Sequence, residues 1–130
     1  PYFKERVKFT KEMTDAAFLH HSCGNVHDLV DDLIDSGVDM LNPIQPTNEM
    51  MAPARLKEEF GDRIVFHGGL DTQEVLPFGT EDTVKAAVNE LISTMNVDGG
   101  YVFAAAHNIQ PDVPPENVIH MFRAAREAGS

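Results

Sequence analysis

The chain has 130 residues, which is enough for one domain with a single core and too few for two. Ten basic and 21 acidic residues give a net charge of -11, which argues against a nucleic-acid or anionic-membrane surface, since either needs a basic patch. No apolar run approaches the roughly 20 residues of a membrane span, and the lone cysteine excludes an internal disulfide and is typical of a cytoplasmic protein.

Short apolar runs alternate with helical patterns along the chain, after a first segment that also has a helical pattern. Such an alternation predicts a parallel sheet with helical crossovers. Leu29, Val30, Leu33 and Ile34 share one face of the first crossover helix, and Gly37 ends it. We expect strands at 17–20, 38–41, 63–66 and 101–104, and helices at 27–37, 53–60, 80–95 and 115–129.

Four βα units preceded by a helix predict an α/β fold, the C-terminal half of a (β/α)8 TIM barrel, whose full form takes about 250 residues. A doubly wound open sheet is the alternative, but no G-x-G-x-x-G follows a strand. We expect residues 1–130 to be a single domain whose N-terminal part is missing, because the chain starts without Met inside a helix. Half a barrel leaves open sheet edges, so we expect a homodimer or a need for the missing half.

Residues just past the strands of a parallel barrel face a common mouth, where a small-molecule substrate binds. Four of the six histidines and the only cysteine lie at these positions, and this clustering is the main functional signal. We therefore expect substrate-binding residues at Asn25, Asn42, Gln45 and His67, and catalytic ones at Asp71 and His107. The complete set is His20, His21, Cys23, Asn25, Asn42, Gln45, His67, Asp71, His107, Asn108 and Asp112.

The His21-x-Cys23 pair is the sharpest local pattern. Alternate residues of an extended segment point the same way, and imidazole with thiolate suits zinc. Catalytic zinc usually has three protein ligands, and His107 at another strand end is the natural third. The structural alternative makes Cys23 a small buried residue and His21 a hydrogen-bonded one. His107 could instead donate a proton or contact an anion.

Other residues in the mouth also have two interpretations. Gly68 and Gly69, after His67, either let the backbone approach a substrate or form a tight turn. Asp71 either orients a substrate or a histidine, or caps a turn. We expect His27 and His120 to be surface or packing residues on helices.

Three segments resemble the C-terminal half of the uroporphyrinogen decarboxylase superfamily: HHSCGNVHDLVDDLIDSGVDMLNPIQP, IVFHGGLDTQEVLPFG and GGYVFAAAHNIQPDVPPENVIHMF. The resemblance covers nearly the whole chain from about Phe18. It implies a barrel enzyme with one of two chemistries. One is cofactor-free decarboxylation in porphyrin biosynthesis, and the other is zinc-dependent methyl transfer from a methyl-corrinoid to a thiol.

The motifs divide between these two branches. His21 and Cys23 are similar to the zinc motif of the methyltransferases, whose third ligand is usually a cysteine. Here that place holds His107, which resembles the decarboxylase pattern G-H-G-x-x-P-D. The arginine-rich substrate segment of the decarboxylases lies in the N-terminal half, outside this chain.

Only the methyl-transfer chemistry has a visible set of residues in the chain, so we expect a zinc-dependent methyltransferase. Its cofactor would be zinc, its cosubstrate a corrinoid and its partner a corrinoid protein. The alternatives are a cofactor-free uroporphyrinogen decarboxylase and a non-catalytic module that binds a corrinoid or tetrapyrrole. With half the mouth missing, we expect the chain alone to be inactive.

Overall fold

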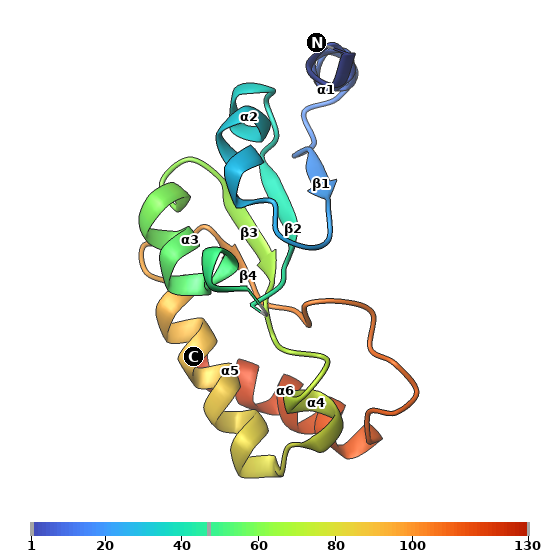
Figure 1. Cartoon of the computed structure of the whole chain (residues 1–130), viewed down its shortest axis with the longest axis vertical. Helices are drawn as coiled ribbons and strands as arrows, with labels where there is room; N and C mark the ends of the chain where they lie inside the picture. Colours follow the sequence, from blue (N-terminus) through green and yellow to red (C-terminus); the bar gives the residue numbers. More distant parts are fainter. Residues whose placement is uncertain (1, 47, 130) are drawn as a thin grey trace.

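The computed structural model describes residues 2–46 and 48–129. Its four strands form one parallel sheet in the order β1-β2-β3-β4, with helices between them, so the predicted α/β half-barrel architecture is confirmed (Figure 1). The elements are α1 (Tyr2–Met13), β1 (Leu19–His21), η1 (His27–Leu29), α2 (Val30–Asp35), β2 (Met40–Ile44), η2 (Glu49–Met51), α3 (Pro53–Phe60), β3 (Val65–Gly68), α4 (Val75–Phe78), α5 (Glu81–Met95), β4 (Tyr101–Val102) and α6 (Pro115–Ala128).

The first three strands end later than predicted, so polar residues expected beyond them lie inside the sheet. His21 ends β1, Asn42 lies within β2 and His67 lies within β3. Ladder hydrogen bonds join backbone groups and are indifferent to side-chain polarity, so pairing continues past each apolar run. The fourth strand is shorter than predicted, and an isolated bridge between Leu70 and Ala105 continues the pairing beyond it.

Proline interrupts the regular ladder of β2. Pro43 follows a cis peptide bond from Asn42, and the register between β2 and β3 shifts between Leu41 and Ile44. Proline has no N–H to donate, so an irregular position is where a strand tolerates it. The predicted end of this strand at Leu41 was therefore wrong, because Asn42 and Pro43 also belong to it.

Two of the helices begin where their sequences predict. α5 begins after Thr80, whose hydroxyl accepts a hydrogen bond from the Thr83 N–H, and α3 begins at Pro53. The first crossover helix instead opens with the 3-10 turn η1, and Leu29 in that turn is exposed rather than buried. α4 and η2 were not predicted.

One buried core joins the sheet to its helices. Among its largest fully buried side chains are Leu41, Ile44 and Phe66 of the strands. α5 and α6 pack together at the end of the molecule away from α1 (Figure 1). The buried Asn117 side chain ties α6 to α4, because its Nδ2 donates to the carbonyl oxygens of Leu76 and Gly79. These two bonds hold α6 against the segment that follows β3.

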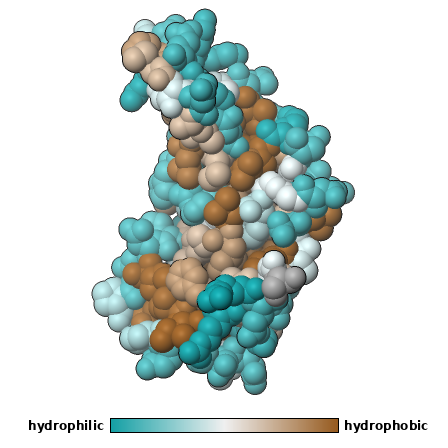
Figure 2. Space-filling view, turned by 180° about the vertical axis from the view of Figure 1, so that it is seen from behind, coloured by the Kyte–Doolittle hydropathy of each residue, from teal (hydrophilic) through white to brown (hydrophobic). Residues whose placement is uncertain are grey.

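Apolar side chains remain on the surface in several places (Figure 2). Exposed examples include Phe9 on α1, Phe78 on α4 and Phe122 on α6. β1 and β4 lie at the two edges of the sheet. The expected homodimer or missing half stays a prediction. Within the described residues, no helix combines the length and apolar character needed to cross a membrane.

Candidate metal centre

Three side chains that the sequence predicts as metal ligands lie together at the C-terminal edge of the sheet. His21 ends β1, Cys23 follows two residues later, and His107 lies in the loop after β4. Their ligand atoms all lie within 4.8 Å of one another, and the three residues are exposed. The Cys23 Sγ is 3.3 Å from the His21 Nε2. The predicted convergence is therefore observed, and metal binding stays a prediction.

Asn42 and His67 lie behind His21 in a row of hydrogen bonds. The His21 Nδ1 is 2.7 Å from the Asn42 Oδ1, and the Asn42 Nδ2 is 2.6 Å from the His67 Nδ1. An amide oxygen only accepts, so the His21 Nδ1–H donates to it, and in the neutral ring the lone pair is then on the Nε2. Both residues also line a cleft beside His107. Their predicted role in substrate binding stays a prediction.

The loop that carries Cys23 is held by two of the predicted substrate-binding residues. The Gln45 Oε1 accepts a 2.6 Å hydrogen bond from the Gly24 N–H, where φ is +84°. The Asn25 Oδ1 accepts from the His27 N–H at 3.2 Å and so forms an Asx turn before η1. Both contacts shape the loop, and substrate binding by Asn25 and Gln45 stays a prediction.

Packing explains the two glycines after His67 without a ligand. Gly68 and Gly69 are buried and have φ values of +100° and +109°, which disfavour other residues. A Cβ on Gly69 would lie 2.9 Å from the Ile44 Cδ1. The Gly68 carbonyl accepts from the Tyr101 hydroxyl at 2.6 Å, and burial raises the pKa of Tyr101 well above its ordinary value. The geometry is that of a tight turn, and substrate binding by the glycines stays a prediction.

Asp71 caps the turn before α4. Its Oδ1 accepts from the backbone N–H groups of Gln73 at 2.6 Å and Glu74 at 3.1 Å. This is the turn-capping alternative for Asp71, although the residue also lines a cleft with His107. Its catalytic role stays a prediction.

His20 was expected at the mouth and lies elsewhere. Its ring packs edge-on against Phe3 of α1, with centroids 5.0 Å apart. Neighbouring residues of a strand point to opposite faces, so His20 and His21 cannot both face the mouth. Burial lowers the pKa of His20, and the charge of His21 lowers it further.

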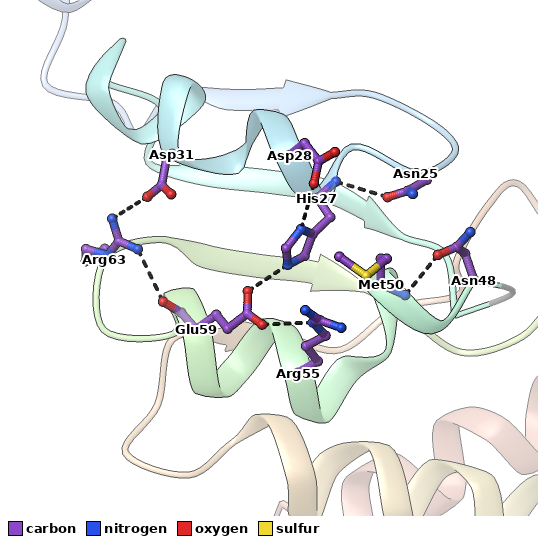
Figure 3. Close-up of polar contacts among 9 residues, drawn as sticks. All are labelled: Asn25, His27, Asp28, Asp31, Asn48, Met50, Arg55, Glu59 and Arg63. Carbon is purple, nitrogen blue, oxygen red and sulfur yellow. Dashed lines mark hydrogen bonds and ion pairs between the residues drawn. The ribbon is translucent and has the colours of Figure 1, made fainter.

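His27 forms a separate polar network on the helical side of the molecule (Figure 3). Its Nε2 lies 2.6 Å from the Glu59 Oε2 of α3, and its Nδ1 lies 3.2 Å from the Asp28 Oδ1. The hydrogen bond from His27 is the main cause that lowers the pKa of Glu59, and a 2.8 Å bond from Arg55 adds to it. Arg63, which follows α3, forms a 2.6 Å ion pair with Asp31 of α2 and so adds a second link between these neighbouring helical segments. His27 is thus a packing residue, as expected.

Two clefts meet at His107. One has a volume of about 350 Å³ and the other of about 440 Å³. Within the described part of the chain, neither lining contains lysine or arginine. The smaller is lined by His21, Asn42, Pro43, His67, Ala104, Ala105, Ala106, His107, Asn108, Ile109, Met121 and Phe122, and the larger by Gln45, Pro46, Asp71, Thr72, Gln73, Ala106, His107, Asn108 and Gln110.

Comparison with known proteins gives the family. The sequence model of the uroporphyrinogen decarboxylase (URO-D) family matches residues 1–128. A uroporphyrinogen decarboxylase from Pelodictyon phaeoclathratiforme is 26% identical over 124 residues, which cover 91% of this chain and 33% of the relative. One from Legionella pneumophila (strain Lens) is 31% identical over 74 residues, or 57% of this chain and 20% of the relative.

The fold also matches a solved enzyme. A methyltransferase from Methanosarcina mazei superposes with a TM-score of 0.77 and 26% sequence identity, over 98% of this chain and 36% of its own. The chain spans between a fifth and just over a third of the length of these relatives. The chain belongs to the uroporphyrinogen decarboxylase (URO-D) family.

Proposed function

We propose that the chain is part of a zinc-dependent enzyme that transfers a methyl group between a methyl-corrinoid and a thiol. The observation that carries the proposal is the cluster of His21, Cys23 and His107, whose ligand atoms lie within 4.8 Å of one another. Two nitrogens and one sulfur are the donors that zinc prefers, and three protein ligands leave a fourth position for a substrate.

The arrangement of the donors fits such an ion. Ligands on one zinc ion with bonds of about 2.0–2.3 Å lie roughly 3.5 Å apart in a tetrahedron. The Cys23 Sγ and the His21 Nε2 are 3.3 Å apart. The hydrogen bond from the His21 Nδ1 to Asn42 leaves the Nε2 lone pair facing this sulfur. All three donors are exposed, so a substrate can reach them.

The chain's own residues would divide the work between holding the ion and binding the substrates. When bound, zinc stabilises a thiolate at neutral pH. His21, Cys23 and His107 would hold it at the point where the two clefts meet. The larger cleft offers the side-chain amides of Gln45, Gln73, Asn108 and Gln110. These amides can donate to and accept from a neutral ligand that carries amides, as a corrinoid does. A corrinoid protein is the proposed partner.

Decarboxylation of a porphyrinogen is the second candidate, and the names of the curated relatives favour it. A substrate with several carboxylates needs cations to hold them. The linings of the two clefts, within the described residues, contain none. The arginine-rich segment of the decarboxylases lies outside this chain, so the donor cluster of His21, Cys23 and His107 is what favours methyl transfer as the first candidate.

Metal analysis of the purified protein tests the proposal. We expect near-stoichiometric zinc in the wild type and a loss of zinc in Cys23→Ser and His107→Ala. His120→Ala is the matched control, because His120 lies on α6 beside Glu81 and away from the cluster. A wild-type protein without zinc, or Cys23→Ser with unchanged zinc, contradicts the proposal.

Assays with both substrate classes separate the remaining candidates. Demethylation of methylcobalamin by a thiol, followed in the visible spectrum, is expected for the protein that contains this chain in full length. Turnover of uroporphyrinogen with no dependence on zinc would instead support the decarboxylase. Cobalamin binding without turnover of either compound would support a non-catalytic module.

A further inference from the structure

Asn42 lies between two histidines on neighbouring strands. His21 of β1 is the register partner of Asn42 in β2, and His67 follows Phe66, the β3 partner of Leu41. The three side chains thus form a row across β1, β2 and β3, which lie side by side in Figure 1. Their hydrogen bonds are short, at 2.7 Å and 2.6 Å.

The Asn42 amide turns its oxygen towards His21 and its nitrogen towards His67, and this orientation selects which ring nitrogen of His21 carries the proton. Its oxygen can only accept, so it requires a proton on the His21 Nδ1. Its nitrogen can only donate, so it requires a lone pair on the His67 Nδ1. A reversed amide would place the His21 proton on Nε2, pointing at the Cys23 Sγ, and would remove the lone pair that a metal needs.

We infer that Asn42 is a positioning residue for the metal centre, which selects the Nδ1–H tautomer of His21, and that His67 sets the direction of the Asn42 amide. The inference rests on the proposed function for its purpose, although the row of hydrogen bonds stands without it. Metal-bound histidines commonly donate their second N–H to an oxygen, which fixes the ring and its tautomer. Here the oxygen belongs to a neutral amide that is itself tied to another strand.

The tautomer of His21 is the direct readout, and a purely structural role for Asn42 would not change it. Nitrogen-15 NMR of the metal-free chain at mildly alkaline pH distinguishes Nδ1–H from Nε2–H. We expect His21 to be Nδ1–H in the wild type and in Asn42→Asp, which keeps the acceptor. We expect a mixture in Asn42→Leu, which is similar in size but cannot accept. His67→Leu is expected to give a smaller shift, since the amide can then turn.

Zinc affinity by chelator competition is the second readout. Asn42→Leu is expected to weaken zinc binding about 10- to 100-fold, the usual effect of losing such a partner. Asn42→Asp should bind at least as well as the wild type, because a carboxylate acceptor makes the imidazole more basic. His67→Leu should weaken zinc binding only a few-fold, because His67 contacts Asn42 and acts on the metal ligand only through it. Asn89→Leu, on the exposed side of α5, is the control for an asparagine far from the site.

The outcomes separate the inference from the function on which it rests. If the wild type binds zinc through Cys23 but Asn42→Leu keeps both the tautomer and the affinity, the inference is overturned and the proposed function stands. If the wild type binds no zinc, both are overturned. If Asn42→Leu does not fold by circular dichroism, His67→Leu and Asn42→Asp decide, because an unchanged tautomer in His67→Leu contradicts the role of His67.

Discussion

Two histidines of this chain lie in similar polar surroundings but face different partners. His27 has an acceptor-only carboxylate beside each ring nitrogen, at 2.6 Å and 3.2 Å, so both nitrogens already face protein partners (Figure 3). His21 has one neutral amide oxygen at Nδ1, and its Nε2 faces a thiol. The side chain of His27 is only 11% exposed, whereas His21 is exposed.

The contrast shows that the partners of a histidine indicate its task better than its position on a helix or strand does. Carboxylates on both sides hold His27 as a link between η1 and α3. An amide on one side leaves His21 able to act as a ligand. The predictions below test this division, from the largest expected effect to the smallest.

The largest effect is expected on metal binding when the two histidines are exchanged for alanine in turn. His21→Ala should weaken zinc binding by more than about a hundredfold, because a three-ligand site loses a direct ligand. His27→Ala should leave zinc affinity within a few-fold of the wild type on the same scale. Chelator competition measures both, and equal losses in the two variants would abolish the distinction.

The reverse order is expected for stability. His27→Ala should lower the free energy of unfolding of the metal-free protein by about 0.5–3 kcal/mol, because the largely buried His27 ring loses its packing and its hydrogen bonds to the exposed carboxylates of Glu59 and Asp28. The ring also leaves its contact with Phe60, where the centroids are 5.4 Å apart. Urea unfolding measures the change, and His21→Ala, with its exposed ring, should cost less. A larger cost for His21→Ala would contradict the assignment.

The pH dependence of stability is expected to come from Glu59, a carboxylate partner of His27. Hydrogen bonds from His27 and then Arg55 lower the pKa of Glu59 from its ordinary value of 4.5. The stabilisation from Glu59 is therefore fully present above pH 4.5 and is lost as the pH falls through the lowered pKa. Glu59→Gln should reduce the acid sensitivity of unfolding in this range. Asn42→Asp replaces a neutral amide with a carboxyl group that titrates. We expect this variant to add a pH dependence to the free energy of unfolding that the wild-type amide does not contribute.

The smallest effect is expected at the rim of the His27 network. Asp31 accepts a 2.6 Å bond from Arg63, but the two side chains are 67% and 42% exposed. Solvent and salt screen such pairs, so Asp31→Asn should change the unfolding midpoint much less than His27→Ala does. Thermal unfolding at low and high salt tests this. A change as large as that of His27→Ala would show that the network acts as one unit.

Local signals in the sequence were enough to place most helices. The predicted helix at 53–60 coincides with α3, and the prediction that Thr80 opens α5 is confirmed. Proline at a first turn and a hydroxyl at an N-cap act within a few residues, so they are visible without the fold. The exposure of Leu29 was missed because the 3-10 turn before α2 changes the angular spacing.

The site was predictable as a cluster but not as a hydrogen-bonded arrangement. His21, Cys23 and His107 come together because parallel strands end at one edge, a rule that the order of elements supplies. The row from His21 to His67 through Asn42 depends on strand register, which no single segment determines. The misplacement of His20 was avoidable, because two adjacent strand residues cannot face the same side.

The cluster draws on opposite edges of the sheet, and this has a mechanical consequence. His21 and Cys23 belong to the β1 edge, and His107 follows β4 at the other edge. An ion held by all three would act as a cross-link between the segments that follow the two edge strands, where these segments converge. Edge strands are where a sheet opens first, and a ligand that binds only the closed form makes opening costlier in proportion to its concentration. Amide hydrogen exchange in β1 and β4 should therefore slow together when zinc is added.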